Sequence, residues 1–206
     1  AMVAVVGLRG QRRLVYSGGV GAQDTLGLPD VLLALADQGG QQIEVLVHDF
    51  FMISPSYTLL GADDWYHGVP QGAGPLAQDP AHLAYPSASQ RPSLAQWQQA
   101  WGALITACDQ ITVFCETGRD ILVQAYPQAA GKCRVVPHKL PPLPPVIAPP
   151  AQTAGPVVGV LGNIGVHKGA AVVCQLSRDM ARCGAGRVVV IGELNPDHAV
   201  TAPSLV

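Results

Sequence analysis

Charge is scarce in this sequence. Charged residues make up 13% of the 206 residues, and twelve basic against fourteen acidic residues give a formal net charge of −2. Nucleic-acid-binding domains usually gather Lys and Arg on one face or along one stripe. No basic stripe is present, so we expect no nucleic-acid partner. Apolar residues reach 49%, which is ample for a buried core and unlike the composition of disordered chains.

Cysteine pairs and long apolar runs are also lacking. The five Cys residues are odd in number and none stands in C-x-x-C spacing, so we expect neither a disulfide framework nor a zinc site, and the sequence favours a reducing compartment. The six His residues show no metal-ligand spacing, so no metal is predicted. No apolar run approaches the roughly 18 residues that a membrane-spanning helix needs.

Several familiar catalytic motifs are absent. The sequence contains no G-x-G-x-x-G, no P-loop and no G-x-S-x-G. A nicotinamide-dependent enzyme would need the first of these and an acidic residue about 20 positions later. A serine hydrolase of the α/β type would need the third. These absences argue against both classes.

Short β-rich segments alternate with helical patterns along the chain. Such alternation predicts an α/β protein with a parallel sheet, covered on both faces because its strands are apolar on both sides. Strands are predicted at Leu14–Ser17, Ile43–Val47, Ile111–Phe114, Cys133–Val136, Val157–Leu161 and Arg187–Ile191. Helices are predicted at Pro29–Asp37, from Ser93 onwards, at Thr117–Tyr126 and at Lys168–Cys183.

The helical patterns predict which side chains face the core. Ser93 and Gln96 form a capping box at the start of one helix. Its tryptophan pair, Trp97 and Trp101, is interpreted as core packing rather than as a sugar-stacking platform. The inward sets are Val31, Leu32, Leu35 and Ala36 in the first helix, Trp97, Trp101, Leu104, Ile105 and Cys108 in the next, and Val172, Val173, Leu176 and Met180 in the last.

A proline-rich segment divides the chain into two parts. We predict an amino-terminal domain over 1–137, a semi-rigid linker over 138–156 and the start of a second domain over 157–206. The linker could also serve as a proline-rich ligand for an SH3-type partner. The last part is too short to bury both faces of its sheet, so we expect a truncated protein, or association of this part with another copy.

Chemistry is expected at the carboxyl ends of the parallel strands, where open sheets bind ligands. Gly162, Asn163 and Gly165 form a predicted turn between a strand and a helix, and Lys168 follows. Free backbone N–H groups, the helix dipole and the lysine charge suit a phosphate. The same turn could instead serve only helix–strand packing.

The same rule also selects Ser17-Gly18-Gly19, His48-Asp49, Cys115-Glu116, Pro137-His138 and Gly192-Glu193. His48 follows a buried strand, and either a catalytic or a structural role fits it. Gly192 and Glu193 are predicted to begin a loop beside the phosphate-binding turn. Cys115 also follows a strand, but no activating partner is evident, so we interpret it as a small apolar residue.

Five segments, in order, resemble bacterial group 1 glycosyltransferases. His48–Leu60 (HDFFMISPSYTLL) is similar to their HDYF-x-x-CPSYTLL signature, and 93–101 (SLAQWQQAW) to their S-x-x-EWR-x-x-W helix. Cys133–His138 (CRVVPH) resembles the strand before their linker. Val158–Ala170 (VGVLGNIGVHKGA) and Val188–Glu193 (VVVIGE) resemble the opening of their donor domain.

The resemblance implies a fold and a chemistry. It implies two Rossmann-like GT-B halves, both incomplete here and joined by the proline-rich linker. Such enzymes transfer a sugar from a nucleotide-diphosphate sugar to an acceptor hydroxyl of a carbohydrate or lipid-linked acceptor, with retention and without metal or cofactor. The resemblance implies a place in bacterial polysaccharide or glycoconjugate synthesis, in the cytoplasm or peripherally at the inner membrane. His48 matches the histidine that faces the transferred sugar. Lys168, Gly162 and Gly165 match the lysine and the turn at the diphosphate.

The sequence departs from the family pattern at several points. Asn163 stands where Arg is frequent, and Cys115 where Ser is usual. The carboxylate pair Glu-x7-Glu is absent, because Glu44, Glu116 and Glu193 are the only glutamates. The first strand and helix of the amino-terminal domain are expected to be missing. A non-catalytic GT-B-like scaffold is therefore a second interpretation, and a Rossmann-type oxidoreductase a third.

Overall fold

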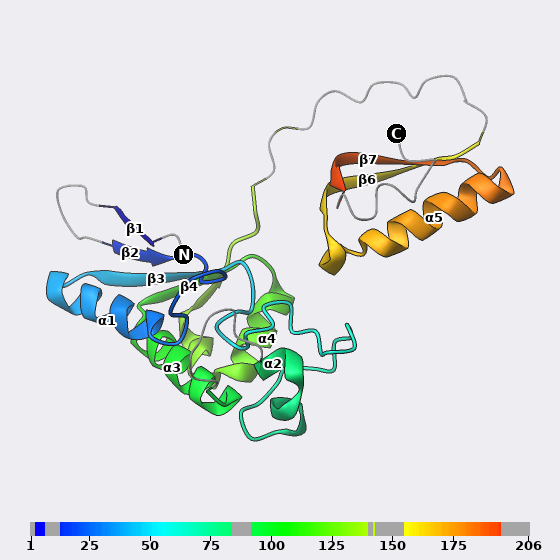
Figure 1. The fold of residues 1–206 in the computed structure, drawn as a ribbon. Coiled ribbons are helices and arrows are strands. Elements are labelled where there is room, and N and C mark those ends of the chain that lie inside the picture. Colours follow the sequence, from blue (N-terminus) through cyan, green and yellow to red (C-terminus); the bar gives the residue numbers. More distant parts are fainter. Residues whose placement is uncertain (1–2, 7–12, 84–91, 140–141, 143–154, 195–206) are drawn as a thin grey trace. The chain divides into compact units, whose positions relative to one another are not determined.

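The computed structural model describes residues 3–6, 13–83, 92–139, 142 and 155–194. The chain divides into two compact units, Ala1–Pro141 and Pro142–Val206, and each is an α/β structure with parallel strands (Figure 1). The predicted linker lies mostly outside the described residues. None of the described helices combines the length and the apolarity that crossing a bilayer requires.

The first unit is built on a five-stranded sheet in the order β1-β2-β3-β4-β5. β1 pairs antiparallel with β2, and all other pairs are parallel. β1 was not predicted from the sequence, whereas the other four strands were. Their bounds are β1 Val3–Val6, β2 Arg13–Tyr16, β3 Gln42–Val47, β4 Gln110–Val113 and β5 Cys133–Val135.

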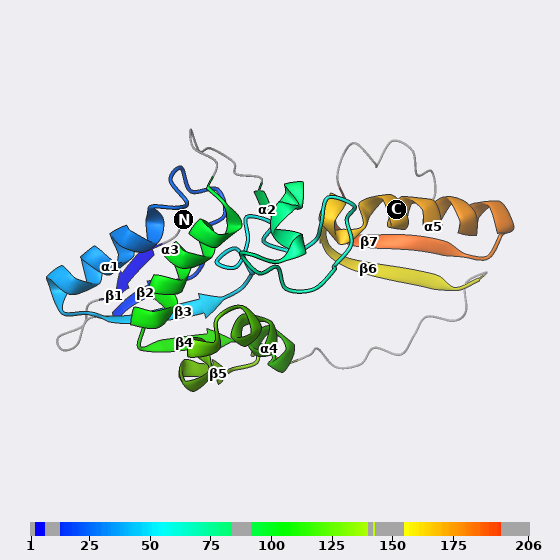
Figure 2. The ribbon, with the colours of Figure 1, turned by 90° about the horizontal axis from the view of Figure 1, so that it is seen from below.

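Three helices, α1 (Leu28–Gly39), α3 (Leu94–Ala107) and α4 (Glu116–Ala125), pack on one face of this sheet (Figures 1 and 2). The short α2 (Pro80–Leu83) and the 3-10 turns η1 (Pro75–Gln78) and η2 (Pro127–Lys132) lie in the connections. The predicted capping box is confirmed, because Ser93 and Gln96 bond reciprocally at the start of α3.

The core of this unit lies between the helices and one sheet face. The predicted inward set of α3 is confirmed, since all five side chains are at most 1% exposed. The predicted face of α1 is partly wrong. Leu32 and Ala36 are buried, but Val31 and Leu35 are 55% and 43% exposed. The four apolar residues cover too wide an arc to contact α3 and the sheet together, so the helix buries only the part of the arc around Leu32.

The opposite face of the sheet is polar. The carboxylate of Glu44 on β3 accepts hydrogen bonds from Arg13 (2.8 Å), Gln110 (3.0 Å) and Thr112 (2.9 Å) on the neighbouring strands. The prediction of helices on both faces is therefore wrong for the described residues. On this face Arg13, Glu44, Gln110 and Thr112 are hydrogen-bonded to one another, and the apolar Val15 and Leu46 beside them are only half-buried.

The second unit is smaller. β6 (Val157–Ile164) and β7 (Arg187–Leu194) pair in parallel, and α5 (Ala170–Cys183) lies along one side of them (Figure 1). The helix buries the small residues Ala170, Cys174 and Ser177. The predicted inward face is wrong at Val172 and Leu176, which are 71% and 40% exposed. Small side chains let α5 approach the two-stranded sheet closely and turn the larger ones away.

Candidate functional site

Three rings gather at the carboxyl end of the first sheet. His48 follows β3 directly, Phe114 follows β4 directly, and His138 stands shortly after β5. Because these strands are parallel neighbours, the residues that follow them meet at one edge. Phe114 stacks on His138 at a centroid distance of 3.9 Å and on His48 at 4.6 Å, and the two imidazoles are 5.9 Å apart. We call His48, Phe114 and His138 the ring cluster.

The ring cluster is held by backbone pairing on the side of the sheet, and its two histidines are exposed to solvent. The backbone N–H of Val136 donates to the carbonyl of Val113 at 2.8 Å, which extends the pairing of β4 and β5 up to the rings. Phe114 is half-buried, whereas His48 and His138 are exposed. The cluster therefore presents two exposed imidazoles, each able to form a hydrogen bond with a bound molecule, on a partly buried aromatic ring.

Asp49 adds a carboxylate beside the cluster. Its Oδ1 accepts a hydrogen bond from the backbone N–H of Phe51 at 3.0 Å. Burial raises the pKa of the Asp49 carboxyl, and the Phe51 N–H and the nearby His48 partly oppose this rise. The carboxylate of Asp49 therefore lies close to the imidazole of His48.

The loop after His48 is part of the core, which explains its long apolar sequence. Phe51, Met52 and Ile53 are at most 1% exposed. Their carbonyls accept hydrogen bonds from the Trp97 indole (2.9 Å), the Tyr126 hydroxyl (2.6 Å) and the Gln98 amide (3.1 Å), respectively. The tryptophan pair is thus core packing, as predicted, and Trp97 also anchors the segment that follows His48.

The loop after β2 closes over the same region. A Cβ on Gly19 would lie 2.8 Å from the Tyr16 hydroxyl and 3.1 Å from the Phe51 ring, so only glycine fits there without displacement. Burial, and then the charge of Asp49, raise the pKa of the Tyr16 phenol. Tyr16 is therefore a neutral, buried side chain that lines the site.

Sequence reasoning selected His48 and His138 as residues beyond the carboxyl ends of strands, and the structure brings both to one sheet edge. It gave Phe114 no role, although Phe114 stands at the end of the strand between theirs. Cys115 was interpreted as a small apolar residue. It is exposed instead, and its Sγ accepts a weak hydrogen bond from the Gly118 N–H at 3.4 Å as the N-cap of α4.

The predicted phosphate-binding turn lies later in the chain than expected. Gly162 and Asn163 belong to β6, and the turn runs from Gly165 to Gly169, before α5 begins at Ala170. Lys168 lies in the 3-10 turn η3 (Val166–Lys168) and is exposed. The predicted helix start at Lys168 is therefore two residues early, because Gly169, at φ +77°, breaks the helix there.

Backbone N–H groups of this turn are used internally. Those of Lys168 and Ala170 both donate to the carbonyl of Gly165, at 3.0 and 3.2 Å, and that of Gly169 donates to Val166 at 3.0 Å. They are not free to bind a phosphate in this conformation. What the turn offers an anion is the exposed charge of Lys168 and the amino-terminal end of the α5 dipole.

Gly192 and Glu193 form part of β7, not the predicted loop. They pair in register with Gly162 and Asn163 of β6. Both glycines have positive φ, +136° at Gly192 and +115° at Gly162, and a Cβ on Gly192 would collide with the Gly162 carbonyl. Glycine here permits close approach of two strands instead of a turn. Glu193 is exposed at the end of this pair.

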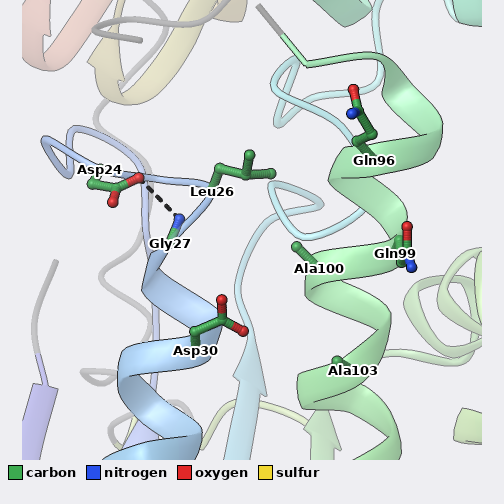
Figure 3. A pocket seen from close by; sticks show the side chains of 8 residues that line it. All are labelled: Asp24, Leu26, Gly27, Asp30, Gln96, Gln99, Ala100 and Ala103. Carbon is green, nitrogen blue, oxygen red and sulfur yellow. Dashed lines mark hydrogen bonds between the residues drawn. The ribbon is translucent and has the colours of Figure 1, made fainter. Parts of the chain in front are cut away.

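A groove lined by both polar and apolar residues lies between the start of α1 and α3 (Figure 3). Its volume is about 530 Å³. Asp24 shapes its rim by accepting a hydrogen bond from the Gly27 N–H at 2.9 Å. It was not predicted from the sequence. The lining residues are Asp24, Leu26, Gly27, Asp30, Gln96, Gln99, Ala100 and Ala103.

Within the described part of the chain, no three side chains of His, Cys, Asp or Glu are placed to share a metal ion. No protein-family model matches the sequence, and a search of curated proteins gave no match either.

Proposed function

We propose that this chain is part of a retaining, metal-independent glycosyltransferase of the GT-B kind, which transfers a sugar from a nucleotide-diphosphate sugar to an acceptor hydroxyl. The observation that supports this most is the placement of His48. Its exposed imidazole stands at the carboxyl end of a parallel strand, stacked on Phe114 and beside Asp49. A group held at that edge can contact a bound sugar directly.

In this proposal His48 faces the transferred sugar and donates a hydrogen bond to one of its hydroxyls. A hydrogen bond donated by the imidazole strengthens as negative charge grows on the reacting oxygens. The ring centroids of His138 and His48 are 5.9 Å apart, so His138 offers a second hydrogen-bond donor to the same molecule. Phe114 holds both rings through stacking.

The leaving diphosphate is assigned to the start of α5. The exposed Lys168 and the positive end of the helix dipole stabilise a group that gains charge in the transition state, and this preference for the transition state is what accelerates a reaction. Gly162, Asn163, Gly165, Gly192 and Glu193 remain the predicted residues of the donor side.

One observation favours a second candidate, a non-catalytic GT-B-like scaffold. The N–H groups of Lys168, Gly169 and Ala170 are bonded within their own turn. A protein that does not bind a diphosphate has no need to release them. Catalysis would require this turn to rearrange or Lys168 to act without them.

Donor binding separates the two candidates. Saturation-transfer NMR with UDP-glucose and GDP-mannose as probes should show contact with at least one of them. Lys168→Ala should weaken that contact at least tenfold. The control Arg182→Ala removes another exposed cation, at the other end of α5, and should leave binding unchanged. Equal binding by wild type and Lys168→Ala, or no binding to a panel of nucleotide sugars, would favour the scaffold.

A further inference from the structure

Two large aromatic side chains on one loop are exposed to solvent. Trp65 is 73% exposed and Tyr66 is 49% exposed, whereas Trp97 and Trp101, the only other tryptophans, are fully buried. Aromatic rings contribute most to stability when buried, and neighbouring exposed rings usually mark a surface that binds something. The loop over residues 61–70 that carries them is named here the aromatic loop.

The aromatic loop has a fixed internal structure. The Asp63 carboxylate accepts a hydrogen bond from the Trp65 N–H at 3.1 Å and lies 2.8 Å from Nε2 of His67. The His67 contact, followed by the Trp65 N–H, lowers the pKa of the Asp63 carboxyl. The Gly61 N–H donates to the Trp65 carbonyl at 2.8 Å, and Leu60 bridges to Tyr66.

The loop is also tied to the body of the first unit. Asp79 accepts the Ala62 N–H at 3.0 Å, and the Gln98 amide on α3 donates to the Pro70 carbonyl at 2.8 Å. Gly61, Val69 and Pro70 are buried at its base. Both rings are therefore presented on a preorganised frame, which reduces the ordering cost of binding.

The electrostatic setting of the rings limits what can bind. Neither Lys nor Arg occurs between Leu14 and Gln90, and Asp63 and Asp64 directly precede the ring pair. Aromatic residues that anchor proteins at membrane surfaces are usually accompanied by basic residues that attract anionic lipids. Here the local charge is negative, so an anionic membrane or an anionic polymer is repelled.

We propose that Trp65 and Tyr66 form a stacking surface for a glycan that carries no negative charge. The apolar C–H face of a sugar ring can cover an aromatic ring, while its hydroxyls donate to the carboxylates of Asp63 and Asp64. Carboxylates accept such bonds strongly. An apolar peptide would cover the rings equally well, but its backbone N–H groups are fewer and more widely spaced than the hydroxyls that surround a sugar ring. This binding goes beyond the proposed function, because it requires no sugar transfer.

Tryptophan fluorescence reports this site directly. Trp65 is the one tryptophan exposed to solvent, so a ligand that covers it should shift the emission to the blue and protect it from iodide quenching. We expect both changes with chitotetraose, a neutral oligosaccharide, and with its amine-bearing form, the chitosan tetramer. A hyaluronan tetrasaccharide, which carries carboxylates, should cause neither.

Variants separate stacking at the loop from other binding. By isothermal titration calorimetry, Trp65→Ala should weaken chitotetraose binding at least tenfold, and Trp65→Phe by less, because a ring remains. The control Val31→Ala removes an exposed apolar side chain from α1 and should bind as wild type. Circular dichroism of each variant confirms the fold.

Three outcomes would overturn the proposal. They are unchanged affinity in Trp65→Ala, equal binding of chitotetraose and the hyaluronan fragment, and protection of Trp65 by phosphatidylcholine–phosphatidylglycerol vesicles but by no oligosaccharide. The last would identify a membrane surface instead. A protein that binds chitotetraose at Trp65 but binds no nucleotide sugar would retain this inference and lose the proposed function, so the two can fail separately.

Discussion

The imidazole of His138 lies on the ring of Phe114 at a centroid distance of 3.9 Å, with only 10° between the two planes. This contact joins the ends of β4 and β5, and through Phe114 it also supports His48. His138 and the proposed catalytic His48 thus belong to the same stacked cluster.

The stack should be measurable as a coupling energy. A double-mutant cycle with Phe114→Leu and His138→Ala should give an interaction of about 0.5–1 kcal/mol, the lower part of the range for aromatic pairs, because His138 is exposed. Urea unfolding provides the four free energies. The cycle of Phe114→Leu with His67→Ala, a histidine outside the cluster, should give less than about 0.3 kcal/mol. Equal coupling in both cycles would contradict the stack.

Two adjacent glycines provide a matched test of the loop after β2. Gly19→Ala places a methyl group against the Tyr16 hydroxyl and the Phe51 ring, and should reduce the free energy of unfolding by about 1–3 kcal/mol. A Cβ on Gly18 meets nothing within 4 Å, so Gly18→Ala should change the free energy of unfolding by less than about 0.5 kcal/mol. Denaturant titration of both variants checks the difference. Similar losses at the two positions would show that the loop is not tightly packed.

His82 should make stability depend on pH. It is 1% exposed, and its Nδ1 lies 2.8 Å from the Ser54 hydroxyl. Burial lowers the pKa of His82, and the charge of Asp79 partly opposes this. The unfolded chain therefore binds a proton at a higher pH than the folded chain. As pH falls below about 6.5, the free energy of unfolding should decrease, by at most about 1.4 kcal/mol per pH unit.

The matched variants for this test are His82→Asn and His67→Gln. Asparagine keeps a polar group near Ser54 but does not titrate. The decrease in the free energy of unfolding between pH 6.5 and the pH at which carboxylates begin to protonate should therefore become smaller. His67 is exposed, and its replacement should leave that part of the profile in place. A profile that is unaltered in His82→Asn would show that another group controls it.

The second unit should associate with another molecule through its apolar surface. Leu161 and Ile191 are paired across β6 and β7, and are 75% and 59% exposed. Exposed apolar strand pairs favour association. Light scattering should therefore give a mass above that of one chain, and Leu161→Lys should lower it. The control Gln175→Lys, on the exposed part of α5, should not. A monomer at all concentrations would contradict this expectation.

The sequence predicted the strands β2 to β7 and the helix start at Ser93 because their signals are local. An apolar run bounded by polar residues marks a buried strand, and Ser93 bonds to a residue only three positions away. The inward set of α3 followed for the same reason, since its helical period is repeated over the whole element.

Other features depend on contacts between distant segments. β1 forms only by pairing with β2, and His138 reaches Phe114 only through the register that pairs Val113 with Val135. Glycine is common in turns, so the sequence predicted turns at Gly162 and Gly192. The two residues are instead paired directly across β6 and β7, where the strands lie close together. Ser54 and His82 are 28 residues apart, so no spacing rule could relate them.

Turnover of Lys168 variants tests the proposed function most directly. The native full-length protein is assayed for release of nucleoside diphosphate and for retention in the product, at saturating nucleotide sugar. Lys168→Ala should lower kcat by roughly 10²-fold or more, the effect of removing one electrostatic donor to a developing charge. Lys168→Arg should recover only part of it, because the guanidinium places its charge differently. Turnover of Lys168→Ala close to that of the wild type would contradict the assignment, and the absence of transfer from any nucleotide sugar would contradict the proposed function itself.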